Sequence, residues 1–157
     1  MILRITLEID SGKRERMSKW SQTAFSKFSD KEQLGKLSRE IFDSGSQDKI
    51  DYIFKMFEEE VAEFNKDSGN KDILSYRYKR GEAFFSVTRN GSGTSLKVTF
   101  AKRGEINING CGGLDFNNDI LIMPDTEKNN CYFADSKGHP IDINEAVHKS
   151  LNALLGI

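Results

Sequence analysis

The sequence predicts an α+β fold: an N-terminal strand, three helices, an antiparallel β-meander and a C-terminal helix, with the helices packed on one face of the sheet. Three observations predict it. Apolar and polar residues alternate over residues 2–9, apolar residues recur at helical spacing over 13–66, and the period returns to two from residue 73 onward. Turn signals containing glycine separate the later segments, as in a meander of strands. The length of 157 residues suits a single domain spanning residues 1–157.

The composition is that of an ordinary globular protein. Hydrophobic residues make up 37% and charged residues 30% of the chain, which excludes the disordered and fibrous classes. No run approaches the roughly 18 apolar residues of a membrane-spanning helix, and residues 1–5 show no basic leader of a signal peptide. We therefore expect a cytoplasmic protein with no membrane association. The two cysteines are too few for a disulfide framework and are expected to be free thiols.

Three helices are predicted in the first half of the chain. The first covers residues 13–28, and Ser29 with Glu32 matches a capping box that would start the second. The sequence Asp-Ser-Gly-Ser at residues 43–46 is expected to break the helical region. The third helix, at residues 47–66, has the most regular apolar stripe and is predicted to cover the sheet with Ile50, Ile53, Phe54, Phe57, Val61 and Phe64.

The meander can be given a pairing register from its turns. A two-residue loop at 80–81 pairs Tyr76 with Phe85, a loop over 90–93 pairs Phe85 with Val98, and a loop over 102–104 pairs Val98 with Ile108. These pairings put the apolar side chains of the meander on one face. Further strands are predicted at 119–123 and 131–134. A final helix is predicted with Asn144 as its N-cap and Gly156 as its end.

The predicted register has a consequence for binding. It leaves a basic and polar face on the other side of the sheet, with Phe84 between Arg77 and Thr99. A protein partner would use this aromatic as an anchor, and single-stranded nucleic acid would stack a base on it. The candidate partner-binding residues are Arg77, Lys79, Phe84, Lys97 and Thr99.

Charge is arranged in blocks although the net charge is only −1. Residues 13–39 carry eight basic and three acidic side chains, and residues 40–67 carry three basic and nine acidic ones. Residues 77–103 are again basic and residues 104–145 acidic. Two interpretations stay open: the blocks neutralise each other locally, or they form separate basic and acidic patches.

One short pattern resembles a known enzyme family. Pro124-Asp125, followed by Asp135-Ser136-Lys137, resembles the signature of the PD-(D/E)xK nucleases. The resemblance implies that Asp125 and Asp135 hold a divalent metal while Lys137 positions the attacking water. The same residues also fit the tip of a hairpin, because Gly138 follows Lys137 directly.

The preferred interpretation is a non-enzymatic protein-binding module, of the inhibitor or immunity type, acting through the basic sheet face on an acidic protein partner. No cofactor or metal is expected on this interpretation. The alternatives are a metal-dependent nuclease using Asp125, Asp135 and Lys137, and a protein that binds single-stranded nucleic acid.

Overall fold

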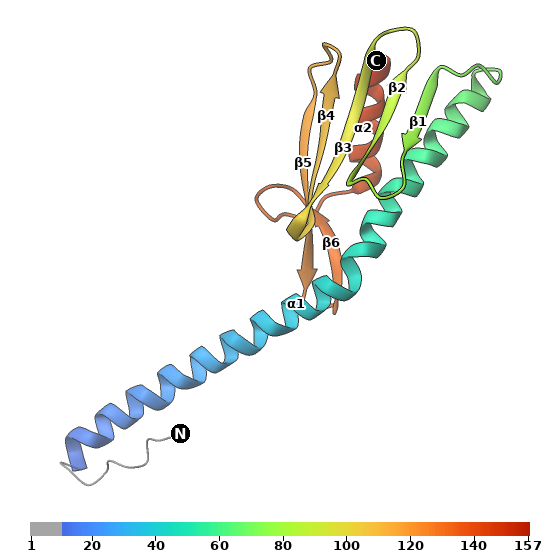
Figure 1. Cartoon of the computed structure of the whole chain (residues 1–157). Helices are drawn as coiled ribbons and strands as arrows, with labels where there is room; N and C mark the ends of the chain where they lie inside the picture. The colour runs from blue at the N-terminus through green and yellow to red at the C-terminus, as the bar shows by residue number, and fades with distance from the viewer. Residues whose placement is uncertain (1–10) are drawn as a thin grey trace. The chain divides into compact units, whose positions relative to one another are not determined.

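The computed structural model describes residues 11–157, with side chains from residue 19 onward. The strand predicted at residues 2–9 lies outside the described residues. Contacts group the described residues into two compact units that divide between Arg39 and Glu40. The elements, drawn in Figure 1, are α1 (Ser11–Asp67), β1 (Leu74–Tyr78), β2 (Phe84–Arg89), β3 (Thr94–Ala101), the 3₁₀ turn η2 (Lys102–Gly104), β4 (Glu105–Cys111), β5 (Asn117–Asp125), β6 (Asn130–Ala134) and α2 (Ile143–Leu155).

The prediction of three separate helices before the sheet is wrong. A single helix, α1, runs through both expected breaks, so residues 11–157 contain two α-helices. At the second expected break, the Ser44 hydroxyl donates to the Ile41 carbonyl at 3.2 Å, which satisfies it inside the helix. Gly45, in the same break, lies against Cys131 of β6. Tertiary packing therefore overrides the weak helix propensity of this segment.

The six strands form one antiparallel sheet in the order β1-β2-β3-β4-β5-β6, as expected for a meander. The predicted pairings of Phe85 with Val98 and of Val98 with Ile108 are confirmed. Gly104, in the loop between β3 and β4, has a φ of 75°, the left-handed conformation that this short loop requires. β5 and β6 are longer than predicted, beginning at Asn117 and Asn130.

The predicted register between β1 and β2 is wrong by two residues. Tyr76 pairs with Val87, and Phe85 pairs with Tyr78. The expected turn does form, because the Glu82 amide donates to the Lys79 carbonyl at 3.1 Å. Gly81 occupies the third position of this turn with a φ of 90°. A turn of this geometry twists in a way that matches the two strands of a hairpin poorly. It therefore favours a longer loop between β1 and β2. A shift of two leaves every side chain on its predicted face.

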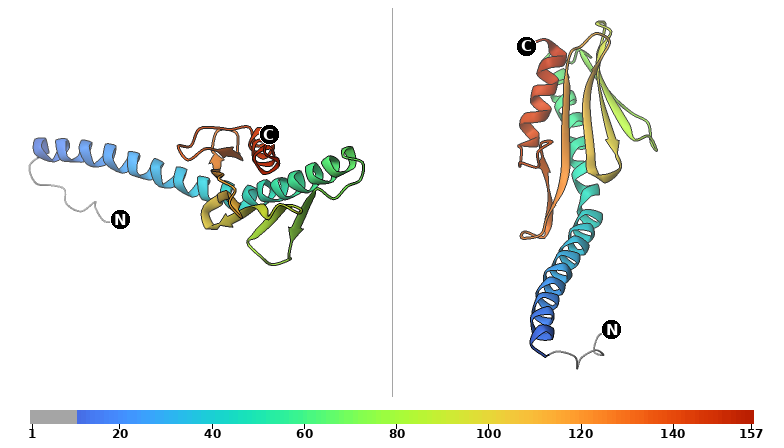
Figure 2. Two further views of the ribbon diagram at one scale, coloured as in Figure 1. Left: turned by 90° about the horizontal axis from the view of Figure 1, so that it is seen from above. Right: turned by 90° about the vertical axis from the view of Figure 1, so that its left-hand side faces the viewer.

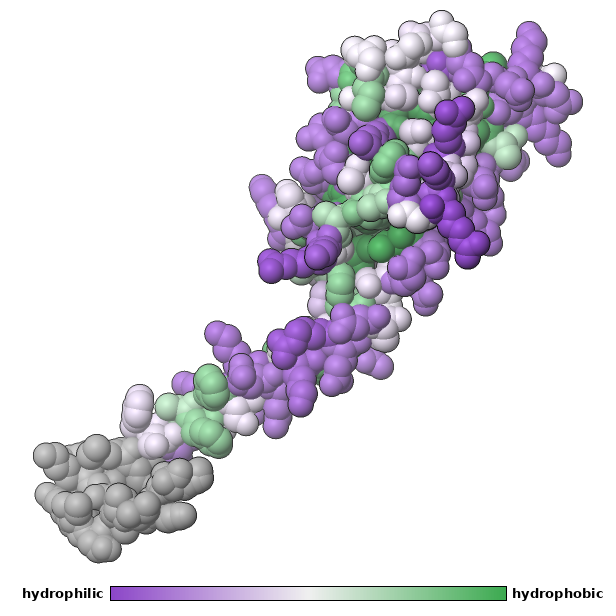
Figure 3. Space-filling view, viewed as in Figure 1, coloured by the Kyte–Doolittle hydropathy of each residue, from purple (hydrophilic) through white to green (hydrophobic). Residues whose placement is uncertain are grey.

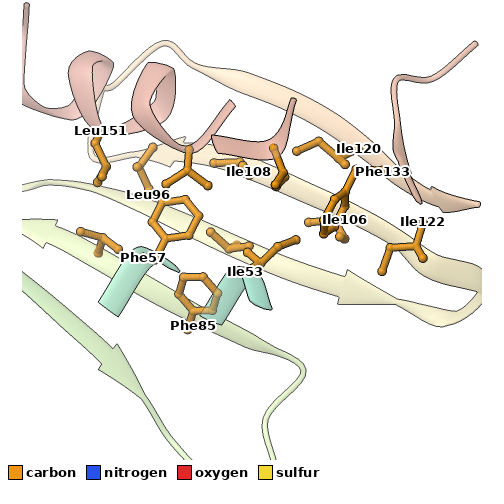
Figure 4. Close-up of a cluster of buried hydrophobic side chains, with 14 of the residues drawn as sticks. Ile53, Phe57, Phe85, Leu96, Ile106, Ile108, Ile120, Ile122, Phe133 and Leu151 are labelled. Carbon is orange, nitrogen blue, oxygen red and sulfur yellow. The ribbon is translucent and has the colours of Figure 1, made fainter. Parts of the chain in front are cut away.

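The helices pack on one face of the sheet, called here the inner face (Figure 2). In the second unit, residues 40–67 of α1 contribute Ile53, Phe57 and Val61, of which Ile53 and Phe57 are fully buried. Phe54 and Phe64 are half-buried at the margin of this core. Figure 4 shows Phe57 and Leu151 of α2 among the inward side chains of the strands. The predicted role of this helical stripe is confirmed.

The N-cap of the terminal helix lies two residues before the predicted one. Asp142 is the N-cap and accepts a hydrogen bond from the Asn144 amide at 2.9 Å, so the assignment of Asn144 as the cap is wrong. An aspartate is equally suited to this position, since its carboxylate accepts from the free amides of the first turn. Gly156 ends the helix in the left-handed conformation, as predicted. Within residues 11–157, neither helix has an apolar stretch long enough to cross a bilayer.

Candidate functional site

The outer face of the sheet, opposite the helices, is a polar surface with one aromatic ring. Two rows of paired residues cross it. The first contains Phe84, Thr99, Asn107 and Asp119, and the second contains Arg77, Ser86, Lys97, Asn109 and Asn117. None of these side chains is buried. Strand alternation explains the arrangement, because each is the neighbour in sequence of an inward residue such as Phe85 or Val98.

Phe84 lies on this face and is half-buried. Lys97 of β3 places its Nζ 4.5 Å from the centre of the Phe84 ring. The pairing of Phe84 with Thr99 puts Lys97 diagonally across from the ring, within reach of a long side chain. This cation–π contact holds the ring against the sheet and leaves part of it open to solvent.

The basic residues of the face lie on its β1–β3 side. Arg77 is exposed and pairs with Ser86, so it is not directly opposite Phe84 as the sequence predicted. Lys79 is exposed just after the end of β1. Thr99 is half-buried. The register shift therefore changes the neighbours of Phe84 but keeps all five candidate partner-binding residues on or beside one face.

The β4–β5 side of the outer face is acidic and rich in amides. The Asn107 side-chain amide donates to Asn117 Oδ1 and to Asp119 Oδ1, both at 2.7 Å. Beside them is a shallow hollow of about 440 Å³, lined by residues that include Thr99, Glu105, Asp119, Leu121 and Ser136. The outer face is thus divided into a basic half around Phe84 and an acidic half around Asp119.

No protein family, curated protein or solved structure matches this chain. Its function is therefore inferred from the geometry of the molecule itself.

The residues of the nuclease-like pattern are separated in space. Asp125 ends β5 and pairs with Asn130, whereas Asp135 follows Ala134, which pairs with Leu121. Asp125 and Asp135 therefore lie at opposite ends of the hairpin, five residues or roughly 16 Å apart along the strand at about 3.3 Å per residue. Among the described residues, no group of three or more acidic, histidine or cysteine side chains is arranged to hold a metal ion.

Each of these two carboxylates accepts hydrogen bonds from its own turn. Asp125 Oδ1 accepts from the amides of Glu127 and Lys128. Asp135 Oδ1 accepts from the amides of Lys137 and His139, both at 2.9 Å. The hydrogen bond from the His139 amide is the largest influence on the pKa of Asp135 and, with the bond from the Lys137 amide, lowers it, although desolvation of the carboxyl opposes this change. The geometry is that of turn-capping aspartates.

The two cysteines and two histidines do not converge either. Cys131 is buried, with its thiol 3.5 Å from the Ile41 carbonyl, and burial raises its pKa. Cys111 lies at the end of β4. His148 Nε2 is 2.7 Å from Glu60 Oε2, which joins α2 to α1.

Sequence reasoning missed the acidic half of the outer face. It stopped the register at Asn107, although extending the same alternation through β5 would have placed Asp119 beside it. It also missed Tyr78 and its acidic neighbours on α1, because their proximity depends on how the helix packs on β1.

Proposed function

We propose that this chain is a protein-binding domain, of the inhibitor or immunity type, whose contact surface is the outer face of the sheet around Phe84. The position of Phe84 carries the proposal. Its neighbour Phe85 fills the core, so Phe84 adds nothing to the main core cluster, and it lies among polar residues on a face that no described helix covers. Aromatic anchors surrounded by polar groups often dominate binding energy at protein interfaces.

The charge division of the face indicates the chemistry of the partner. Arg77, Lys79 and Lys97 favour carboxylates opposite the β1–β3 side, whereas Glu105 and Asp119 favour donors or cations opposite β4–β5. The phosphate backbone of a nucleic-acid strand that crossed the whole face would be repelled by these two carboxylates. The ring of Phe84 is also covered in part by Lys97, which leaves less of it for base stacking. Both observations favour a protein over a single-stranded nucleic acid.

The test begins with affinity capture from the native host, and the recovered protein is then used for binding measurements. Phe84→Ala is expected to weaken binding by about 2 kcal/mol or more, because it removes the anchor. Thr88→Ala, also on the outer face but away from Phe84, is the matched control and is expected to change affinity little. Urea denaturation should give similar unfolding free energies for both variants. An unchanged affinity for Phe84→Ala would reject this surface.

Charge reversal separates steering from anchoring. Arg77→Glu with Lys97→Glu is expected to slow association and to reduce its salt dependence, while dissociation changes less. Lys71→Glu with Lys128→Glu makes the same change in net charge at exposed positions outside the face and serves as the control. Equal slowing by both pairs would mean that only the net charge matters. Recovery of heterogeneous, nuclease-sensitive material in the capture would favour nucleic-acid binding instead.

A further inference from the structure

The helical segment at residues 19–39, called here the basic arm, exposes large apolar side chains. The exposed fractions are 73% for Trp20, 68% for Phe25, 60% for Phe28, 53% for Leu34 and 39% for Leu37. Figure 3 shows hydrophobic side chains gathered between hydrophilic ones on this helix. Together they expose on the order of 600 Å² of apolar surface, which is at the upper limit for a monomer. A surface of this kind indicates a docking site.

Charge on the basic arm limits what can cover it. The arm carries five basic and two acidic side chains, a net charge of +3. Lys27 and Lys31 follow Trp20 by seven and eleven residues, so the helical period places them on the same side as Trp20. Two arms packed against each other along this side would bring lysines together. The complementary surface must instead be acidic and partly aromatic.

The second unit has such a surface between α1 and the edge strand β1, called here the acidic groove. It is a hollow of about 520 Å³ lined by Gln47, Asp51, Phe54, Glu58, Tyr76 and Tyr78. The rings of Phe54 and Tyr78 meet edge to face with centroids 4.7 Å apart, and Tyr78 is 42% exposed. Neither Asp51 nor Glu58 has a basic partner within ion-pair distance among the described residues.

The groove also has a negative electrostatic character. Burial, and then the nearby Glu58 carboxylate, raise the pKa of Tyr76 to about 12. Residues 40–67 carry nine acidic and three basic side chains, a net charge of −6. Aromatic rings beside carboxylates are a favourable environment for lysine and arginine side chains. The groove therefore matches the basic arm in charge and in apolar character.

We propose that the basic arm of one copy of this chain binds the acidic groove of a second copy. Every copy carries both halves of the contact, so the interface can close as a symmetric dimer in which it is made twice. Two arms would contribute on the order of 1,200 Å² of apolar surface before the groove area is counted. With the groove area added, the total falls within the roughly 1,200–2,000 Å² that specific, stable interfaces bury.

Charge swapping gives the decisive experiment. The molar mass of the full chain, 17.8 kDa as a monomer, is measured by sedimentation or light scattering over a range of concentrations. Two charge-reversed variants are compared. The arm variant carries Lys27→Glu with Lys31→Glu, and the groove variant carries Asp51→Lys with Glu58→Lys. Each variant is expected to weaken dimerisation at least tenfold. An equimolar mixture of the two is expected to restore the dimer, because in the mixed dimer the reversed arm faces the reversed groove in one contact and the wild-type arm faces the wild-type groove in the other.

Control variants show whether the loss of the dimer is specific to the arm and the groove. Lys71→Glu with Lys128→Glu, and Phe84→Ala, should stay dimeric, because none of these residues lies in either surface. Circular dichroism and urea midpoints should show that the swapped variants are folded. Trp20 is the only tryptophan, so its fluorescence reports whether the arm is covered. The emission is expected to shift to shorter wavelength as concentration rises and to return at high salt.

Three outcomes would overturn the proposal. A dimer that survives the groove reversal would mean that the arms pair with each other. A monomer at every concentration with a shielded Trp20 would mean that the arm packs on its own chain. A monomer with an exposed Trp20 would leave the arm for a different protein.

Discussion

Gly45 of α1 lies against Cys131 of β6 so closely that a side chain at position 45 has little room. A Cβ atom there would lie 3.1 Å from Cys131 Sγ and 3.7 Å from Cys131 Cβ. Cys131 is itself buried, and its thiol points to the Ile41 carbonyl of the preceding helical turn. Gly45 therefore allows the helix to pack closely on the sheet. The sequence alone predicts a helix break at this position.

Gly45→Ala is expected to destabilise the protein. Alanine gains about 1 kcal/mol of helix propensity over glycine, but crowding in a packed core costs about 1–3 kcal/mol. We expect a net loss of about 1 kcal/mol in the free energy of unfolding, measured by urea denaturation.

A double-mutant cycle isolates the cause. In a Cys131→Ala background the sulfur atom is absent, so Gly45→Ala should become neutral or stabilising. Gly35→Ala is the matched helical control, since the nearest atom to its Cβ would be the mobile end of Arg39 at 3.9 Å. It should raise the helical content seen by circular dichroism. Stabilisation by Gly45→Ala in the wild-type background would show that β6 moves easily away from α1.

The fold could be predicted from sequence where local rules and packing agree. The registers of Phe85 with Val98 and of Val98 with Ile108 follow from short turns and from apolar residues that must share one face. The same rules failed at residues 43–46, because the contact of Gly45 with Cys131 joins segments far apart in the sequence. Between β1 and β2 the predicted register was wrong by two residues. A shift of two leaves every side chain on the same face, so the alternation of apolar and polar residues cannot distinguish the two registers.

The candidate site was predictable to the same extent. Strand alternation alone places Phe84 and Lys97 on the outer face, and the structure adds the 4.5 Å contact between them. The acidic groove was not predictable, because Glu58 and Tyr78 meet only through the packing of α1 on β1. The separation of Asp125 from Asp135 likewise depends on the hairpin pairing rather than on the motif.

Asp135→Ala is expected to lower stability at neutral pH. The variant loses the acceptor for the amides of His139 and Lys137, which stabilise the carboxylate and lower its pKa from the ordinary value of 3.8. A lowered pKa in the folded state contributes stability that is present above 3.8 and is lost as the pH falls through the folded-state value. The difference in urea midpoint between wild type and variant should therefore shrink in acid.

Asp135→Asn separates hydrogen bonding from charge. The amide oxygen can still accept from the turn, so this variant should be more stable than Asp135→Ala at neutral pH and should lack the acid dependence. His139 Nδ1 lies 3.6 Å from Asp135 Oδ2, so the measurements are repeated with His139→Gln to remove its charge. A midpoint difference that is the same in acid and at neutral pH would show that the carboxylate charge is unimportant to the turn.

Tyr76 is expected to be a tyrosine that ionises well above the usual range. Burial, followed by the charge of Glu58, raises its pKa from 10.0 to about 12. A raised pKa in the folded state contributes stability that is complete below pH 10.0 and is lost as the pH rises through about 12. Tyr76→Phe removes the ionisable hydroxyl, so its urea midpoint should fall less steeply than that of wild type over this window.

The difference in tyrosinate absorbance between wild type and Tyr76→Phe gives the titration of Tyr76 directly. Glu58→Gln should shift this titration to lower pH by removing a repelling charge. A midpoint at 10.0 in the wild type would show that the groove is neither as dry nor as negative as its geometry indicates.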